Sequence, residues 1–309
     1  MKNLIRSIVF GSLLVGSLSA QQTIKFSNYL FNKTILNPAA AGSNEYFEVI
    51  GSYRTQWASI EGAPTTAFLT ADGVFFDKRI GASVQLVDDR LGALKQTGIV
   101  GNIAPRIRTS SDGWLSLGLA VGLFSSNLDG SELTAPDEGD LAIPESSTRL
   151  NLMDFKAGVY YKDYRNFGGI SVFNIFQPKL NYTASDRANE GVLARHFYTF
   201  VGRVFTVAPK FNVVPSVLLK SDKNFNTELD LNAKLVYDNM IAVGLAFRNG
   251  SSVGVLAEYI HNDLFRIGYA YDYTTTDFNN YENGAHEIML SYRFIQNKKI
   301  LENPRYFYH

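Results

Sequence analysis

Histidine and cysteine, which often carry nucleophilic or metal chemistry, are scarce in this 309-residue chain. It has no cysteine, so thiolate nucleophiles, cysteine-ligated metals and disulfides are excluded. No two histidines have the spacing of a metal-binding helix, and no Gly-x-Ser-x-Gly elbow is present; the histidines are His196, His261, His286 and His309. We therefore predict rim or turn positions for the histidines, and no catalytic residue, metal site or cofactor.

An acidic segment within residues 125–152 could bind calcium through carboxylate oxygens. Arg149 is its only basic residue, and its carboxylates are Asp129, Glu132, Asp137, Glu138, Asp140 and Glu145. The cluster at 137–140 lacks the spacing of a recognised calcium loop. The pattern favours a solvated acidic rim.

Aromatic side chains stand among polar residues in two further segments, and such mixtures suit protein-binding surfaces. Phe176 and Tyr182 lie in segment 174–194, and Phe278 and Tyr281 in segment 274–285. Ordinary loop packing is the alternative interpretation. With Gln56 and Trp57 near the end of the first predicted strand, the candidate outer-rim residues are Gln56, Trp57, Phe176, Tyr182, Phe278 and Tyr281.

The elements that must position these residues are strands. From residue 45 onward, apolar and polar residues alternate in runs of about ten, most clearly over 228–235. The alternation predicts fourteen antiparallel strands at 45–55, 65–76, 79–88, 96–108, 113–124, 153–162, 166–174, 195–207, 211–221, 227–237, 240–248, 252–261, 264–273 and 286–294. Every second connection is short, and an even strand number lets both termini lie in the periplasm.

The second face of these strands carries charges that a dry sandwich core would not tolerate unpaired. Aromatic residues end the apolar faces, as they do where a barrel meets the two membrane interfaces. We therefore predict an all-β transmembrane antiparallel barrel of about 14 strands, with an irregular leader at its periplasmic mouth. The charges predicted to face inward are Glu48, Asp72, Asp230, Glu258, Asp272 and Glu287 against Arg54, Arg106, Lys156, Arg203, Lys234, Arg248, Arg266 and Arg293. They could close the lumen with ion pairs or line a wet channel; the leader's apolar residues favour closure.

The chain divides into four segments. Residues 1–20 have a basic start and an apolar run too short to span a bilayer, which predicts a cleaved signal peptide and export. Residues 21–44 form the predicted plug or periplasmic segment, 45–294 the outer-membrane barrel and 295–309 a C-terminal periplasmic tail. The formal net charge is zero, so nothing indicates a nucleic-acid partner.

Three motifs resemble the PorP/SprF family of outer-membrane proteins from the type IX secretion and gliding machinery of Bacteroidetes. They are Tyr29-x-x-Asn32 with Asn37-Pro38-Ala39-x-Ala41-Gly42, Tyr53-Arg54-x-Gln56-Trp57 with Gly62-Ala63-Pro64, and His286-Glu287-Ile288-x-Leu290-Ser291-Tyr292-Arg293-Phe294. The candidate leader plug or docking residues are Tyr29, Asn32, Asn37, Pro38 and Gly42. The phenylalanine-ended last strand is shared with many barrels, where it serves as an insertion signal, here Tyr292 and Phe294. The extension past Phe294 departs from the family's usual ending.

The resemblance implies an integral outer-membrane barrel, in contact with the lipid bilayer, that works with type IX components on the periplasmic side. Some members associate with periplasmic parts of that machine. Others are needed to export one large surface protein, such as a gliding adhesin, and retain its C-terminal domain at the cell surface. The function predicted here is therefore a non-enzymatic secretion accessory or surface anchor for an exported cargo protein. A passive porin or small-solute transporter, and then an outer-membrane hydrolase, are the alternatives.

Overall fold

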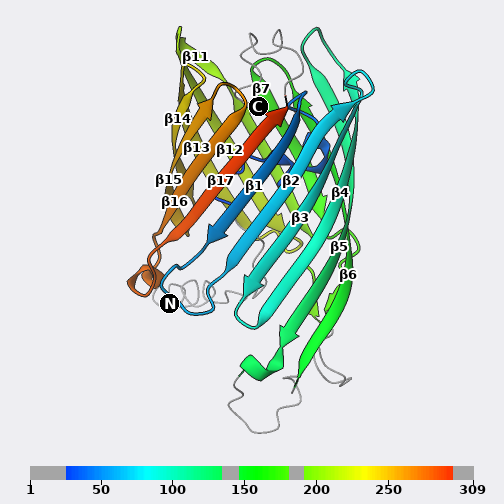
Figure 1. The fold of residues 1–309 in the computed structure, drawn as a ribbon, viewed down its shortest axis with the longest axis vertical. Helices are drawn as coiled ribbons and strands as arrows, with labels where there is room; N and C mark the ends of the chain where they lie inside the picture. The colour runs from blue at the N-terminus through cyan, green and yellow to red at the C-terminus, as the bar shows by residue number, and fades with distance from the viewer. Residues whose placement is uncertain (1–25, 134–145, 181–190, 295–309) are drawn as a thin grey trace, which may run out of the picture.

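The computed structural model describes residues 26–133, 146–180 and 191–294. Its strands form one closed antiparallel barrel (Figure 1), because each strand pairs with its sequence neighbours and the last, β17, pairs with the first, β1. β10 and β11 are two pieces of one strand broken at Val204, and both pair with β12. The barrel therefore has fourteen strands, which confirms the predicted fold class.

The strand bounds follow the predicted pattern closely. The barrel strands are β1 Phe47–Thr55, β2 Thr65–Phe75, β3 Ile80–Leu91, β4 Leu94–Arg108, β5 Trp114–Asp129, β6 Ser147–Lys162, β7 Asn166–Phe173, β10 His196–Arg203, β11 Phe205–Ala208, β12 Phe211–Asp222, β13 Thr227–Tyr237, β14 Ile241–Arg248, β15 Ser252–His261, β16 Phe265–Thr274 and β17 Ala285–Phe294. A separate ladder joins β8 Lys179–Leu180 to β9 Gly191–Val192. The described ranges also contain four short 3-10 helices, η1 Lys33–Ile35, η2 Pro38–Ala40, η3 Gly130–Glu132 and η4 Asp277–Asn280.

The two faces of each strand meet different surroundings. In β13, Asp230 and Lys234 are buried in the lumen, whereas Leu231 and Leu235 are 41% and 39% exposed on the outer surface. This inside-out distribution places apolar side chains against lipid and polar side chains inside the barrel. Within the described residues, no helix is long and apolar enough to span a membrane.

The barrel has two unlike ends, which we name by their connections. At the short-turn end lie β1's first residue, Phe47, and β17's last, Phe294, whereas the long-loop end carries the connections 56–64, 174–195 and 275–284. The β5–β6 hairpin projects furthest at the long-loop end (Figure 1). Its pairing runs to Asp129↔Ser147, so β5 and β6 are longer than predicted. Outside the membrane both faces of a strand can be polar, and the alternation that signals a strand is lost there.

One inward assignment was wrong. Arg203 is exposed on the outer surface. Side chains alternate along β10, and the buried positions Phe200 and Gly202 mark its inward face, so Arg203 lies on the outward face. Its guanidinium carbon lies 5.3 Å from the ring centroid of Phe205, near the short-turn end. A long cationic side chain can reach the membrane surface from such a position.

Candidate functional site

Residues 26–44 run through the lumen from its long-loop half to the short-turn end. Ser27 lies beside Arg54 and Asp272, near the long-loop ends of β1 and β16, and Glu45 lies beside Arg106 at the other end. All these leader residues are buried except Asn44, which is half-buried. The leader was expected at the mouth, and its described part extends well beyond it. The predicted signal peptide 1–20 and tail 295–309 lie outside the described residues.

The candidate leader residues Tyr29 and Asn32 contact the inner wall through hydrogen bonds. The Tyr29 hydroxyl donates to Ser216 Oγ at 2.8 Å, and Asn32 Nδ2 donates to Thr70 Oγ1 at 2.9 Å. Burial raises the pKa of the Tyr29 hydroxyl, so it stays a neutral donor. The two contacts fix the leader to opposite parts of the sheet, β12 and β2.

The segment 37–42 packs directly onto glycines of the inner wall. A Cβ atom at Gly118 of β5 would lie 2.0 Å from the backbone nitrogen of Ala39. A Cβ at Gly81 of β3 would lie 1.9 Å from the carbonyl oxygen of Ala41. Real Cβ contacts are not this short, so only glycine at these wall positions allows the leader backbone to approach so closely.

Asn37 is fully buried and holds both the leader helix and the wall. Its Oδ1 accepts a hydrogen bond from the Ala39 backbone at 2.9 Å, which caps η2, and Pro38 occupies the first helical position. Its Nδ2 donates to the Val159 carbonyl of β6 at 3.0 Å. A Cβ at Gly158 would lie 2.2 Å from Asn37 Oδ1, so this wall position also needs glycine.

Gly42 turns the leader toward the first strand. Its φ of +67° is in the left-handed region that glycine adopts without strain. Its backbone nitrogen donates to Asp72 Oδ1 at 2.9 Å, and its carbonyl accepts from Arg106 Nη1 at 3.0 Å. Two wall side chains, Asp72 and Arg106, thus satisfy the backbone N–H and the carbonyl of this one residue.

Glu45 closes the leader at the short-turn end. Lys78, in the β2–β3 turn, lies 2.7 Å from Glu45 Oε2, and Arg106 Nη2 lies 3.6 Å from Oε1. Burial raises the pKa of Glu45, but the hydrogen bond from Lys78 and the charges of Lys162 and Arg106 outweigh it. The pKa of Glu45 therefore lies below its ordinary value, and the carboxylate is ionised at neutral pH.

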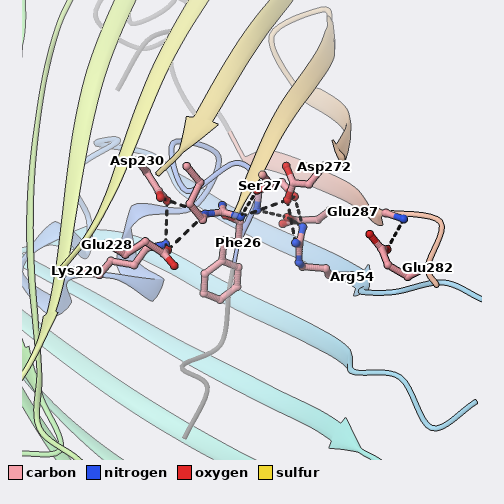
Figure 2. Close-up of polar contacts among 12 residues, drawn as sticks. Phe26, Ser27, Arg54, Lys220, Glu228, Asp230, Asp272, Glu282 and Glu287 are labelled. Carbon is pink, nitrogen blue, oxygen red and sulfur yellow. Dashed lines mark hydrogen bonds and ion pairs between the residues drawn. The ribbon is translucent and has the colours of Figure 1, made fainter. Parts of the chain in front are cut away.

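At the opposite end of the leader, ion pairs surround Ser27 (Figure 2). Its backbone nitrogen donates to Glu287 Oε2 at 2.7 Å, and its hydroxyl donates to Asp272 Oδ2 at 2.8 Å. Arg54 bonds the same hydroxyl and lies 2.8 Å from Asp272.

Arg248 donates to the Phe26 carbonyl at 3.0 Å and is 3.1 Å from Asp230. These charges lie within hydrogen-bond distance of opposite charges or of the leader, as buried charges require.

Lys33 is a buried charged residue of the leader itself. It is 6% exposed, and within the described residues it makes no salt bridge. Its ammonium lies 5.3 Å from the ring centroid of Phe167. Burial, reinforced by the charges of Lys162 and Lys234, lowers the pKa of Lys33 well below its ordinary value. The leader therefore carries one group that opposes its own docking.

Three candidate rim residues, Gln56, Trp57 and Phe278, lie around one cavity at the long-loop end. Gln56 and Trp57 line a cavity of about 200 Å³, and the Trp57 ring meets that of Phe278 edge-on at 5.1 Å. Tyr281 is 74% exposed. Trp57 has a φ of +53°, which is unusual for a bulky side chain and marks local backbone strain.

The remaining described candidates do not line this cavity. Phe176 is 72% exposed, and its ring lies 5.0 Å from that of Phe155. Tyr182 lies outside the described residues. Tyr292 and Phe294 face outward at the short-turn end, with Phe294 paired to Phe47 across the β1–β17 seam. The structure therefore brings the leader candidates into one continuous site. Of the described rim candidates, it gathers Gln56, Trp57 and Phe278 around one cavity and places Phe176 elsewhere.

The family model for the type IX secretion system membrane protein PorP/SprF matches residues 18–292. The chain belongs to the PorP/SprF family. It is an outer-membrane β-barrel. A search of curated proteins gives no match.

Solved structures resemble this PorP/SprF barrel at low sequence identity. A FadL homologue from Pseudomonas aeruginosa is 12% identical with a TM-score of 0.46, and the alignment covers 86% of this chain and 94% of that one. Omp33 from Acinetobacter baumannii is 9% identical with a TM-score of 0.47, covering 81% and 98%.

The three described histidines of the PorP/SprF chain, His196, His261 and His286, lie on different strands. His286 Nδ1 is 2.7 Å from the Tyr269 hydroxyl on the outer face, and His261 is 3.2 Å from the Tyr259 hydroxyl. His196 lies at the long-loop end of β10, and His309 falls outside the described residues. Among the described residues, no group of histidines and carboxylates could hold a metal ion.

The predicted acidic segment is only partly described. Asp129 accepts a hydrogen bond from the Ser131 backbone and thereby caps η3. The cluster at 137–140 lies outside the described residues, so its predicted role as a solvated rim stays a prediction.

Sequence reasoning missed the wall glycines as part of the site. Nothing in the sequence pattern assigned a partner to Gly81, Gly118 or Gly158. The available signal was the composition of the leader itself. Residues 37–42 have almost no side-chain bulk, which suits close backbone packing.

Proposed function

We propose that the chain is a non-enzymatic accessory of type IX secretion that anchors an exported protein at the cell surface. In this proposal, the short turns and the leader face periplasmic components, and the long-loop end holds the C-terminal domain of the cargo. Family membership supports the secretion role, and the loop aromatics support a protein-binding outer end.

The observation that carries this proposal is the leader inside the lumen. A passive porin needs a water-filled path, whereas residues 26–43 are buried here and bonded to many strands. Buried ion pairs at both ends of the leader, Arg54 with Asp272 and Arg106 with Glu45, reinforce the closure. A barrel filled in this way suits a docking platform better than a channel.

Deletion of the coding sequence tests the function in cells. We expect loss of one large protein from the cell surface, assayed by surface proteomics and by motility, with restoration from a plasmid copy. A deletion strain with normal secretion and motility but altered uptake of a small solute would refute the anchor and support the porin.

Purification from the native outer membrane tests the partners. We expect the exported protein to co-purify through its C-terminal domain, together with periplasmic type IX components. A matched preparation with Phe278→Ala and Tyr281→Ala on the long-loop end should lose the cargo and keep the periplasmic components. Equal recovery of the cargo would show that this end of the barrel does not hold it.

A further inference from the structure

A cavity of about 150 Å³ lies in the long-loop half of the lumen, beside the leader. The leader supplies part of its wall through Phe26, Ile35 and Leu36. Strands β2, β5, β7 and β10 supply most of the remaining apolar surface, through Phe68, Phe124, Phe173 and Tyr198. Neither the docking of the leader nor the proposed anchoring role uses this cavity.

The cavity is aromatic on opposite sides. The rings of Phe26 and Phe68 are 5.1 Å apart, and those of Phe173 and Tyr198 are 4.8 Å apart. A dry cavity of about 150 Å³ with apolar walls is large enough to bind benzene. The space therefore matches one aromatic ring or an aliphatic group of similar size.

One cationic group lies at the polar edge of this cavity. The Lys156 ammonium is 4.3 Å from the ring centroid of Phe173 and 3.6 Å from Asp154 Oδ2, which is long for an ion pair. Asp154 is engaged elsewhere, because its Oδ1 accepts the Asn174 backbone N–H at 3.0 Å. Lys156 thus retains capacity to donate to a second, closer acceptor.

The other polar lining groups are amides, the imidazole of His196 and one carboxylate. Two of the amides already donate within the protein, Gln85 Nε2 to Thr34 Oγ1 and Asn174 Nδ2 to the Ala194 carbonyl, both at 2.9 Å. Gln85, Gln96 and Asn174 present amides, and Asp154 is the only carboxylate among the described lining residues. A positively charged ligand would be repelled by Lys156, and the lining carboxylate that could offset this repulsion, Asp154, is already engaged. An anionic head group is the better electrostatic match.

We propose that this cavity binds a small amphipathic carboxylate. The apolar part of this ligand is one aromatic ring or an aliphatic group of similar size. The ring occupies the space between Phe26, Phe68 and Tyr198. The carboxylate accepts hydrogen bonds from Lys156 at the edge. The site is independent of the proposed anchoring role and would exist in a barrel that held no cargo.

Calorimetric titration of the intact, detergent-solubilised barrel with phenylacetate tests the site. We expect saturable binding, and we expect the neutral isostere phenylacetamide to bind at least about tenfold more weakly, since a hydrogen bond to a charged group is among the stronger ones. Lys156→Gln should weaken phenylacetate binding by a similar factor and leave phenylacetamide nearly unchanged. Lys210→Gln, which removes an exposed lysine from the β11–β12 turn, is the matched control and should bind like the parent protein.

A second variant keeps the test decisive if Lys156→Gln disturbs the barrel. Ala194→Trp places a large ring at the cavity edge from a connecting segment rather than a strand, and it should abolish binding of both compounds. Retained heat-modifiable migration on gels shows that each variant is folded. Absence of saturable binding by the parent protein, or equal affinity of the parent and Ala194→Trp, would overturn the proposal.

Discussion

Replacing Gly118 with alanine should displace the leader from the inner wall without unfolding the barrel. The new Cβ would lie 2.0 Å from the Ala39 nitrogen, whereas ordinary contact begins at 3.4 Å, so the leader backbone must move by about 1.4 Å. Such a movement also stretches the 3.0 Å hydrogen bond from Asn37 to Val159 beyond bonding distance.

The size of the effect follows from these two losses. Overpacking of a tight contact costs about 1–3 kcal/mol, and loss of the buried hydrogen bond from Asn37 to Val159 costs about 1 kcal/mol more. A total of about 3 kcal/mol raises the population of undocked leader by a factor of about 100. The outer face of β5 is unchanged, so insertion into the membrane should be normal.

Thiol labelling measures this population, because the chain contains no cysteine of its own. Ser43→Cys places a single, nearly isosteric thiol at a leader position that is 5% exposed. We expect a water-soluble maleimide to react about 100-fold faster when Gly118→Ala is also present. Gly101→Ala is the matched control, because a Cβ there has no heavy atom within 4 Å.

Equal labelling rates in the Gly118→Ala and Gly101→Ala proteins would refute the close leader–wall packing. Planar-bilayer recordings provide an independent check on the same variants. The parent and the control should show little current, and Gly118→Ala should show intermittent opening. A large and stable current from the parent protein would contradict an occluded lumen.

Three further predictions concern the charges around the leader. Arg54→Ala leaves Asp272 and Glu287 buried without their main cation, and we expect a loss of about 3–5 kcal/mol, seen as a lower unfolding temperature on semi-native gels; an unchanged temperature would show that the pairing is dispensable. Lys33→Met removes a buried ammonium that makes no salt bridge with the described residues, so it should slow labelling of the leader thiol and raise the unfolding temperature; a lower temperature would mean that the ammonium is needed. Because the folded pKa of Glu45 is lowered, its contribution to stability is complete above the ordinary carboxyl pKa of about 4.3 and is lost as the pH falls through the folded value. Glu45→Gln should flatten the dependence of unfolding temperature on pH in that acidic window, and an unaltered pH profile would exclude this origin.

The alternation of apolar and polar residues in the sequence predicted most of the barrel strands. Strand β13 was predicted at 227–237 and is observed at Thr227–Tyr237, because lipid on one side and a polar lumen on the other impose strict alternation. The alternation did not reach the long-loop ends of β5 and β6, so both strands were predicted too short. Both faces of these strand ends lie in water, where alternation is no longer required. Arg203 was misplaced because the strand containing it breaks at Val204, between β10 and β11, and its polar character alone suggested an inward position.

The leader shows what local pattern could not supply. Its composition indicated an irregular, buried segment, but its path depends on contacts between residues more than a hundred positions apart, such as Asn37 with Val159 and Ser27 with Asp272. These contacts exist only after the sheet closes and brings distant strands to one lumen. The sequence by itself determined the strands, their two faces and the family motifs, because each depends on neighbouring residues and on the solvent. Closure of the barrel decided which glycines of the wall receive the leader, because a backbone can approach that closely only where three separate strands all lack a Cβ.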